Sequence, residues 1–191
     1  MLNLISIIAV TAFVNNVVLI QLIGVPSFIT NSNRLQSALE LGMTSFIAIF
    51  ISSAVNLFFH RWVLIPLNLV ALRLILFVLI SSIVAFYLVK LIQSSYPLTR
   101  RRYQLALCLI GGNSAVIGIS LILSNDVMSI GMTLATSFGA ALGFALILIG
   151  FAALRDRLRY ADIPERFQGP PIYLISAAII TMILLGFEKL V

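Results

Sequence analysis

The chain has 191 residues, of which 61% are hydrophobic and only 9% are charged, and its formal net charge is +6. A soluble domain is usually about 25% charged, so this composition excludes a soluble globular protein and indicates one that lies in membrane lipid. The basic residues lie in short segments between apolar runs without an aromatic-rich groove, so no nucleic-acid partner is expected, and the single cysteine excludes an intrachain disulfide.

Six apolar runs follow one another along the chain, separated by short polar breaks. Crossing the hydrocarbon core takes about 20 helical residues, so each run is close to one crossing. The sequence therefore predicts an all-α integral membrane protein with six transmembrane helices in a single membrane domain, residues 1–191. The expected spans are Leu2–Gly24, Gln36–Phe59, Pro66–Ile92, Tyr103–Leu123, Ser129–Leu154 and Pro171–Phe187.

Polar and flexible residues interrupt the first and fourth runs, and we expect both helices to be broken there. An amide in mid-span is costly in hydrocarbon unless it finds partners, and consecutive glycines weaken a helix. Two facing breaks can line a cavity for an ion or cofactor; alternatively, the asparagines only link helices by hydrogen bonds. The residues of this candidate ion and electron passage are Asn15, Asn16, Gly24, Gly111, Gly112 and Asn113.

The two halves of the chain, roughly residues 1–95 and 100–191, are expected to be inverted repeats of three helices each. Three spans per half mean that equivalent helices run in opposite directions across the membrane. Besides the paired interruptions, Thr44, Ser45 and Phe46 in the second span match a second Thr-Ser-Phe at residues 136–138 in the fifth. The repeat predicts a site where the halves meet.

The basic residues divide unevenly between the two sides of the membrane. The loops after the first, third and fifth spans, with the adjoining span ends, hold nine basic residues, whereas the other side holds only Arg61 and Lys189. Cytoplasmic loops carry the excess of Lys and Arg, so both termini are expected outside the cytoplasm. The nine residues are Arg34, Lys90, Arg100, Arg101, Arg102, Arg155, Arg157, Arg159 and Arg166.

Arg73, Glu40 and one glycine pair within the predicted spans call for a physical explanation. Arg73 is an intramembrane charge, which either snorkels outward or meets a partner, and Glu40 belongs either to the interface or to an ion path. Gly139 and Gly143 form a G-x-x-x-G pair suited to close helix packing. The sequence suggests no catalytic residue and no metal site built by this chain alone.

Several segments together resemble the A subunit of the Rnf ion-translocating electron-transport complex, and the resemblance runs nearly end to end. The E subunit of the sodium-pumping NADH:quinone reductase is more distantly similar. The segments are FVNNVVLIQLIG in the first span, LRLILFVLIS in the third, GNSAVIG in the fourth, FGAALGFALILIGFAALRDRL in the fifth and ADIPERFQG before the sixth.

This resemblance implies a bacterial inner-membrane protein built from two inverted repeats. It also implies pairing with a homologous subunit of opposite orientation, inside a complex that moves electrons between ferredoxin and NAD while translocating Na+ or protons. Flavins and iron-sulfur clusters are expected on the partner subunits. They would carry out most of the chemistry, while this chain forms part of the passage.

The cluster cysteines of the family are missing from this chain. In the family, one cysteine follows the first broken helix, another follows the asparagine of the fourth, and two from the partner subunit complete an iron-sulfur site. Here the two positions hold Pro26 and Ser114, which are poor ligands for iron. Cys108 precedes Ser114 by roughly 9 Å along an intact helix and does not inherit the position. We therefore expect this chain to bind no cofactor alone.

Three functions remain open at this point. The first is a membrane subunit of an ion-translocating oxidoreductase complex. The second, favoured by the missing cysteines, is a structural or assembly subunit of such a complex without a cluster. The third is an independent transporter of small solutes or ions built on the same inverted repeat.

Overall fold

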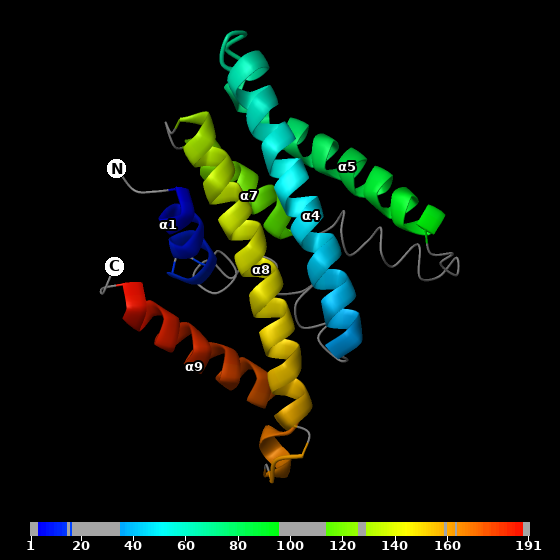
Figure 1. The fold of residues 1–191 in the computed structure, drawn as a ribbon, viewed down its shortest axis with the longest axis vertical. Helices are drawn as coiled ribbons and strands as arrows, with labels where there is room; N and C mark the ends of the chain where they lie inside the picture. Colours follow the sequence, from blue (N-terminus) through cyan, green and yellow to red (C-terminus); the bar gives the residue numbers. More distant parts are fainter. Residues whose placement is uncertain are drawn as a thin grey trace.

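The computed structural model describes residues 4–14, 16, 35–95, 114–125, 129–158, 160–162 and 164–188, and the elements within these ranges are all helical (Figure 1). Several α-helices are preceded or continued by a short π or 3-10 helix, named η. In chain order the elements are α1 (Leu4–Ala9), η1 (Val10–Val14), α4 (Leu35–Phe59), η2 (His60–Leu64), η3 (Val70–Leu72), α5 (Arg73–Ser95), α7 (Ser114–Asn125), α8 (Ile130–Leu158), η4 (Glu165–Phe167) and α9 (Pro170–Glu188).

Three of these helical runs are long and apolar enough to cross a membrane by length and composition. They are Ala38–Leu64, Val70–Ile92 and Ile130–Leu158, which overlap the second, third and fifth predicted spans. Shorter apolar helices, Leu4–Phe13, Ser114–Asn125 and Pro170–Ile183, lie within or overlap the first, fourth and sixth. Within the described residues, the predicted all-helical fold is confirmed, and three of its helices are long and apolar enough to cross a membrane.

The end of the second span differs from the sequence-based prediction. The predicted span ends at Phe59, before the polar residues His60 and Arg61, but the helical run continues through η2 to Leu64. The chain turns only at residues 65–68, where Pro66 lacks an amide hydrogen and Asn68 adopts a φ of 56°. Asparagine tolerates this left-handed conformation better than most residues, which explains why the turn forms there and not at His60 and Arg61.

Helices α4 and α8 form the centre of the molecule, lying side by side and running in opposite directions (Figure 1). Near the middle of the pair, the ring of Phe138 meets Phe46 edge-on at 5.2 Å between centroids and Phe50 at 5.5 Å. Towards the start of α4, Gly42 faces the side chain of Ile149. Small and aromatic residues thus set the antiparallel contact.

Helix α7 completes the main core by packing on both α4 and α8. Ile49 of α4 clusters there with Ile119 of α7 and Phe144 of α8, and all three side chains are buried. On another face of α4, Ala48 packs against Ala85 and Val89 of α5. The core is therefore an arrangement of four helices with α4 at its centre.

Helices α5 and α9 extend away from this centre and expose many large apolar side chains (Figure 1). In water such surfaces would be costly, whereas in a bilayer they contact lipid or other membrane subunits. The exposed side chains include Leu74, Ile75, Leu79, Ile83, Phe86 and Leu91 on α5 and Leu174, Ile175, Ile179, Met182 and Ile183 on α9.

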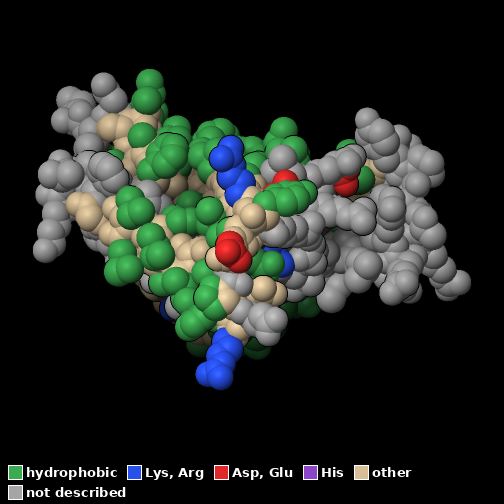
Figure 2. Space-filling model, turned by 90° about the horizontal axis from the view of Figure 1, so that it is seen from below, with side chains coloured by type: hydrophobic (Ala, Val, Ile, Leu, Met, Phe, Trp, Pro, Cys, Tyr) green, Lys and Arg blue, Asp and Glu red, His purple; other side chains and the backbone are tan. Residues whose placement is uncertain are grey.

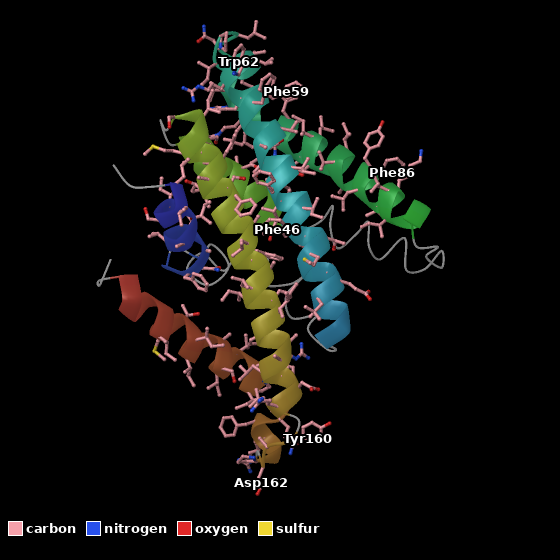
Figure 3. The ribbon with its side chains drawn as sticks, viewed as in Figure 1. Phe46, Phe59, Trp62, Phe86, Tyr160 and Asp162 are labelled. Atoms are coloured by element: carbon pink, nitrogen blue, oxygen red, sulfur yellow. The ribbon has the colours of Figure 1, made fainter. Side chains whose placement is uncertain are left out.

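Charged side chains gather at the end of the molecule where α8 stops. Figure 2 looks at this end and shows Lys or Arg and Asp or Glu side chains set among hydrophobic ones. Arg155 is buried there with its guanidinium over the ring of Tyr173, 4.1 Å from the centroid. Tyr160 and Asp162 lie beyond it, whereas Trp62 lies at the opposite end of the molecule (Figure 3).

Candidate functional site

Asn16, one of the predicted passage residues, lies just after η1 and outside any helix. Its side chain is 1% exposed, and its Nδ2 donates a hydrogen bond to the carbonyl oxygen of Ala12 at 2.8 Å. The amide thus caps a carbonyl at the end of a short helical run, where such groups lack partners within the helix. In hydrocarbon this bond offsets part of the cost of burying the amide.

The glycine pair of α8 lets α1 and η1 come very close. A Cβ atom on Gly143 would lie 2.6 Å from both the Ala12 carbonyl oxygen and Asn16 Nδ2. A Cβ on Gly139 would lie 2.8 Å from the Ile8 carbonyl oxygen and would also clash with the Thr11 side chain. These distances are shorter than carbon and polar atoms tolerate, so only glycine fits. The G-x-x-x-G pair therefore serves packing within the chain and holds Asn16 against α8.

A second polar group, which was not predicted from the sequence, joins three helices in the interior. Asn56 of α4 is fully buried, and its Nδ2 donates to Ser81 Oγ of α5 at 3.1 Å and to Ser120 Oγ of α7 at 2.9 Å. Nearby, Ser53 of α4 bonds to Ser137 of α8. The sequence feature that could have predicted this group is the spacing of Ser52, Asn56 and His60, which are one helical turn apart.

Arg73, predicted as an intramembrane charge, begins α5 and lies at the end of α7. Its Nη1 donates to Asn125 Oδ1 at 2.5 Å and approaches Ser124 Oγ at 3.4 Å. The carbonyl end of a helix carries partial negative charge, which favours a cation there. Arg73 thus meets neutral oxygen partners near the end of its helical run.

The other predicted positions divide into two groups. Ser114 is the first residue of α7 and is exposed, and Glu40 on α4 is also exposed, its carbonyl oxygen accepting a bond from Thr44 at 2.9 Å. The remaining positions lie outside the described residues, so the approach of the two breaks stays a prediction. They are Asn15, Gly24, Pro26, Cys108, Gly111, Gly112 and Asn113.

Among the residues predicted for the passage and for the family's ligand positions, the structure describes Asn16 and Ser114. Within the described residues, no group of three or more His, Cys, Asp and Glu side chains gathers. Ser114 offers a hydroxyl oxygen and the asparagines offer amides, which suit hard cations or water better than iron in a sulfide cluster.

The sequence is similar over nearly its whole length to known membrane proteins. Residues 4–191 match the family described as "Rnf-Nqr subunit, membrane protein". The chain is 34% identical over 181 residues to the A subunit of an ion-translocating oxidoreductase complex from Aeromonas hydrophila, covering 95% of this chain and 94% of that one. The A subunit of the same kind of complex from Actinobacillus pleuropneumoniae is 35% identical over 194 residues, with 100% and 99% covered.

Proposed function

The chain belongs to the Rnf-Nqr family of membrane subunits, and from that premise we propose that it acts as the A subunit of an ion-translocating oxidoreductase complex. The observation that carries the proposal is the full-length match to relatives of that name, together with helices that can cross a membrane. Coupled to electron transfer of the ferredoxin and NAD type, the complex would move Na+ or protons across the bacterial inner membrane.

The fold in the bilayer is six spans in two inverted repeats, with the first and fourth helices broken. The helical run of α1 and η1 ends before Asn16, which lies outside any helix, and this supports the break in the first span because the run is too short to cross alone. The repeat is supported by the contact between Phe46 and Phe138, which are matched residues of the two halves. Equivalent residues meet each other only near a two-fold axis, as in a C2 interface.

Both termini lie on the periplasmic side, and the segment after α8 faces the cytoplasm. The unequal distribution of Lys and Arg along the sequence supports this orientation. Arg155, Arg157 and Arg166 lie at the end of α8 and just beyond it. Arg61 follows the end of α4, and Arg73 begins α5. Both lie at the end of the molecule away from the end of α8.

The chain lines the ion and electron passage with a homologous membrane subunit of opposite orientation, while flavins and clusters sit on other subunits. The exposed apolar faces of α5 and α9 support partners of this kind. Pro26 and Ser114 stand at the family's thiolate positions, so this chain contributes no cluster ligand. The same observation favours a second candidate, a structural subunit of the complex without a redox role.

The test is purification of a tagged chain from its native membranes at low detergent concentration. Proteins of an ion-translocating oxidoreductase complex should co-purify, including a second Rnf-Nqr membrane subunit.

The orientation is tested separately, with single cysteines that replace Arg157 and Val191 in a Cys108→Ser background. An impermeant thiol reagent added to whole cells should label position 191 and not position 157. Recovery of the chain alone, or the reverse labelling, would contradict the proposal.

A further inference from the structure

One helix carries every buried side-chain polar atom that lacks a hydrogen-bond partner among the described residues. These atoms are Ser45 Oγ, Ser52 Oγ, Asn56 Oδ1 and His60 Nδ1, and they lie on α4 and its continuation η2. The steps between them are seven, four and four residues, which correspond to about two, one and one turns of an α-helix. The four atoms therefore form one row along one face, which we call the α4 polar row.

Such a row is unusual because buried polar groups are nearly always satisfied. A serine in a helix can donate to the carbonyl oxygen four residues earlier, as Ser53 does to Ile49 at 2.7 Å. Ser45 and Ser52 lack even this bond, although both are 1% exposed. Burying these hydroxyl groups among apolar atoms without a hydrogen bond would cost free energy. Water or a hydrated ion is therefore the partner that the chemistry requires.

The row lies at a seam between helices. On one side of it, Ala48 packs against α5, and on the other, Ser53 bonds to Ser137 of α8. Asn56 closes the seam with its nitrogen on α5 and α7, which leaves its oxygen as the unpartnered atom. From Ser45 to His60 the row spans roughly 22 Å at 1.5 Å per residue, most of a hydrocarbon core of about 30 Å.

The His60 end of the row reaches a cavity of about 330 Å³, between the end of α4, the end of α7 and the start of α8. Its walls are largely apolar, with His60, Ser124 and Thr133 among the polar side chains and Trp62 and Arg61 also lining it. Trp62 is 63% exposed, as expected for a residue at the membrane interface. Labelled side chains in Figure 3 place Trp62 at this end and Phe46 near the middle of the molecule.

We propose that the α4 polar row holds a file of water molecules that carries the transported cation between this cavity and the middle of the membrane. The proposal rests on the proposed function and adds a route within this chain. Hydroxyl and amide oxygens can replace waters around a small hard cation, and the His60 imidazole can pass a proton along the waters. Arg61 and Arg73 place positive charge at this end, so the cation passes there in its hydrated form, because water screens the repulsion.

The first test compares neighbouring cysteines in the intact complex with Cys108→Ser as background. Ser52 and Ser53 lie at the same depth and are both buried, but only the hydroxyl of Ser53 has partners. A small, charged, water-soluble thiol reagent should modify Ser52→Cys and leave Ser53→Cys unmodified. Equal labelling of the two positions, or labelling of Ser53→Cys alone, would overturn the row.

The second test separates transport from stability. Ser52→Ala removes a hydroxyl without a protein partner, so ion uptake per electron should fall several-fold at an unchanged unfolding temperature. Ser53→Ala loses the bond to Ser137, so it should lower the unfolding temperature by about 2–4 °C and leave uptake unchanged. Uptake is followed with radioactive Na+ and, separately, with a pH-sensitive dye, which distinguishes the two cations.

The experiments distinguish failure of the α4 polar row from failure of the proposed function. If the unmodified complex moves neither cation, the proposed function is wrong, whatever the labelling shows. If the unmodified complex moves a cation and Ser52→Ala transports at the normal rate, the α4 polar row is not its route.

Discussion

Adding one methyl group to Gly143 tests the close contact between α8 and the η1 region. In Gly143→Ala the new Cβ would stand 2.6 Å from the Ala12 carbonyl oxygen and from Asn16 Nδ2, so η1 and Asn16 must move. Overpacking of this kind costs about 1–3 kcal/mol. Alanine in a helix is about 1 kcal/mol better than glycine, which offsets part of that cost.

The matched control is Gly150→Ala on the same helix, where a Cβ meets nothing within 4 Å. It receives the helix gain without the clash, so its unfolding free energy should equal or exceed that of the unmodified chain. The difference between the two variants isolates the contact and should be about 1–3 kcal/mol, measured by thermal unfolding of the purified complex. If both variants have the same unfolding temperature, η1 does not lie against Gly143.

Three further predictions concern Asn16, Asn56 and the two positions where the family has cluster cysteines. Asn16→Leu removes the bond to Ala12 and should reduce turnover while leaving membrane insertion intact; unchanged turnover would restrict the amide to joining helices. Asn56→Leu removes the donor to Ser81 Oγ and Ser120 Oγ and should cost about 1–2 kcal/mol of unfolding free energy, whereas Ser82→Ala, whose hydroxyl bonds only within α5, should be near neutral. Pro26→Cys with Ser114→Cys should add iron and a paramagnetic signal to the anaerobically purified complex; density joining a cluster to Ser114 in the unmodified complex would contradict the donor chemistry.

Hydropathy predicted the helical runs because the bilayer demands long apolar segments with internally bonded backbones. It misplaced the end of the second span because a buried His60 and an exposed Arg61 look identical to a polar break in sequence. The row on α4 was missed for a different reason. A serine in an apolar helix usually donates a hydrogen bond to its own helix backbone. The sequence alone therefore does not show which serines lack that bond.

The glycine pair of α8 also shows what the sequence could not predict. Gly139 and Gly143 predicted a close helix contact, and the structure contains one. Sequence spacing identifies the face that accepts a neighbour, but it does not identify the neighbour. The neighbour is the chain's own first helical run, because Ile8, Thr11 and Ala12 present backbone and small side chains to α8.

The most direct test of the central claim is electron-driven ion uptake by inverted membrane vesicles. Vesicles lacking this subunit should show no uptake when reduced ferredoxin and NAD are supplied, and expression of the unmodified chain should restore it. Expression of Asn16→Leu at equal membrane abundance should restore only part. Normal uptake in vesicles that lack the subunit would contradict the claim that this chain belongs to the passage through which the complex moves ions.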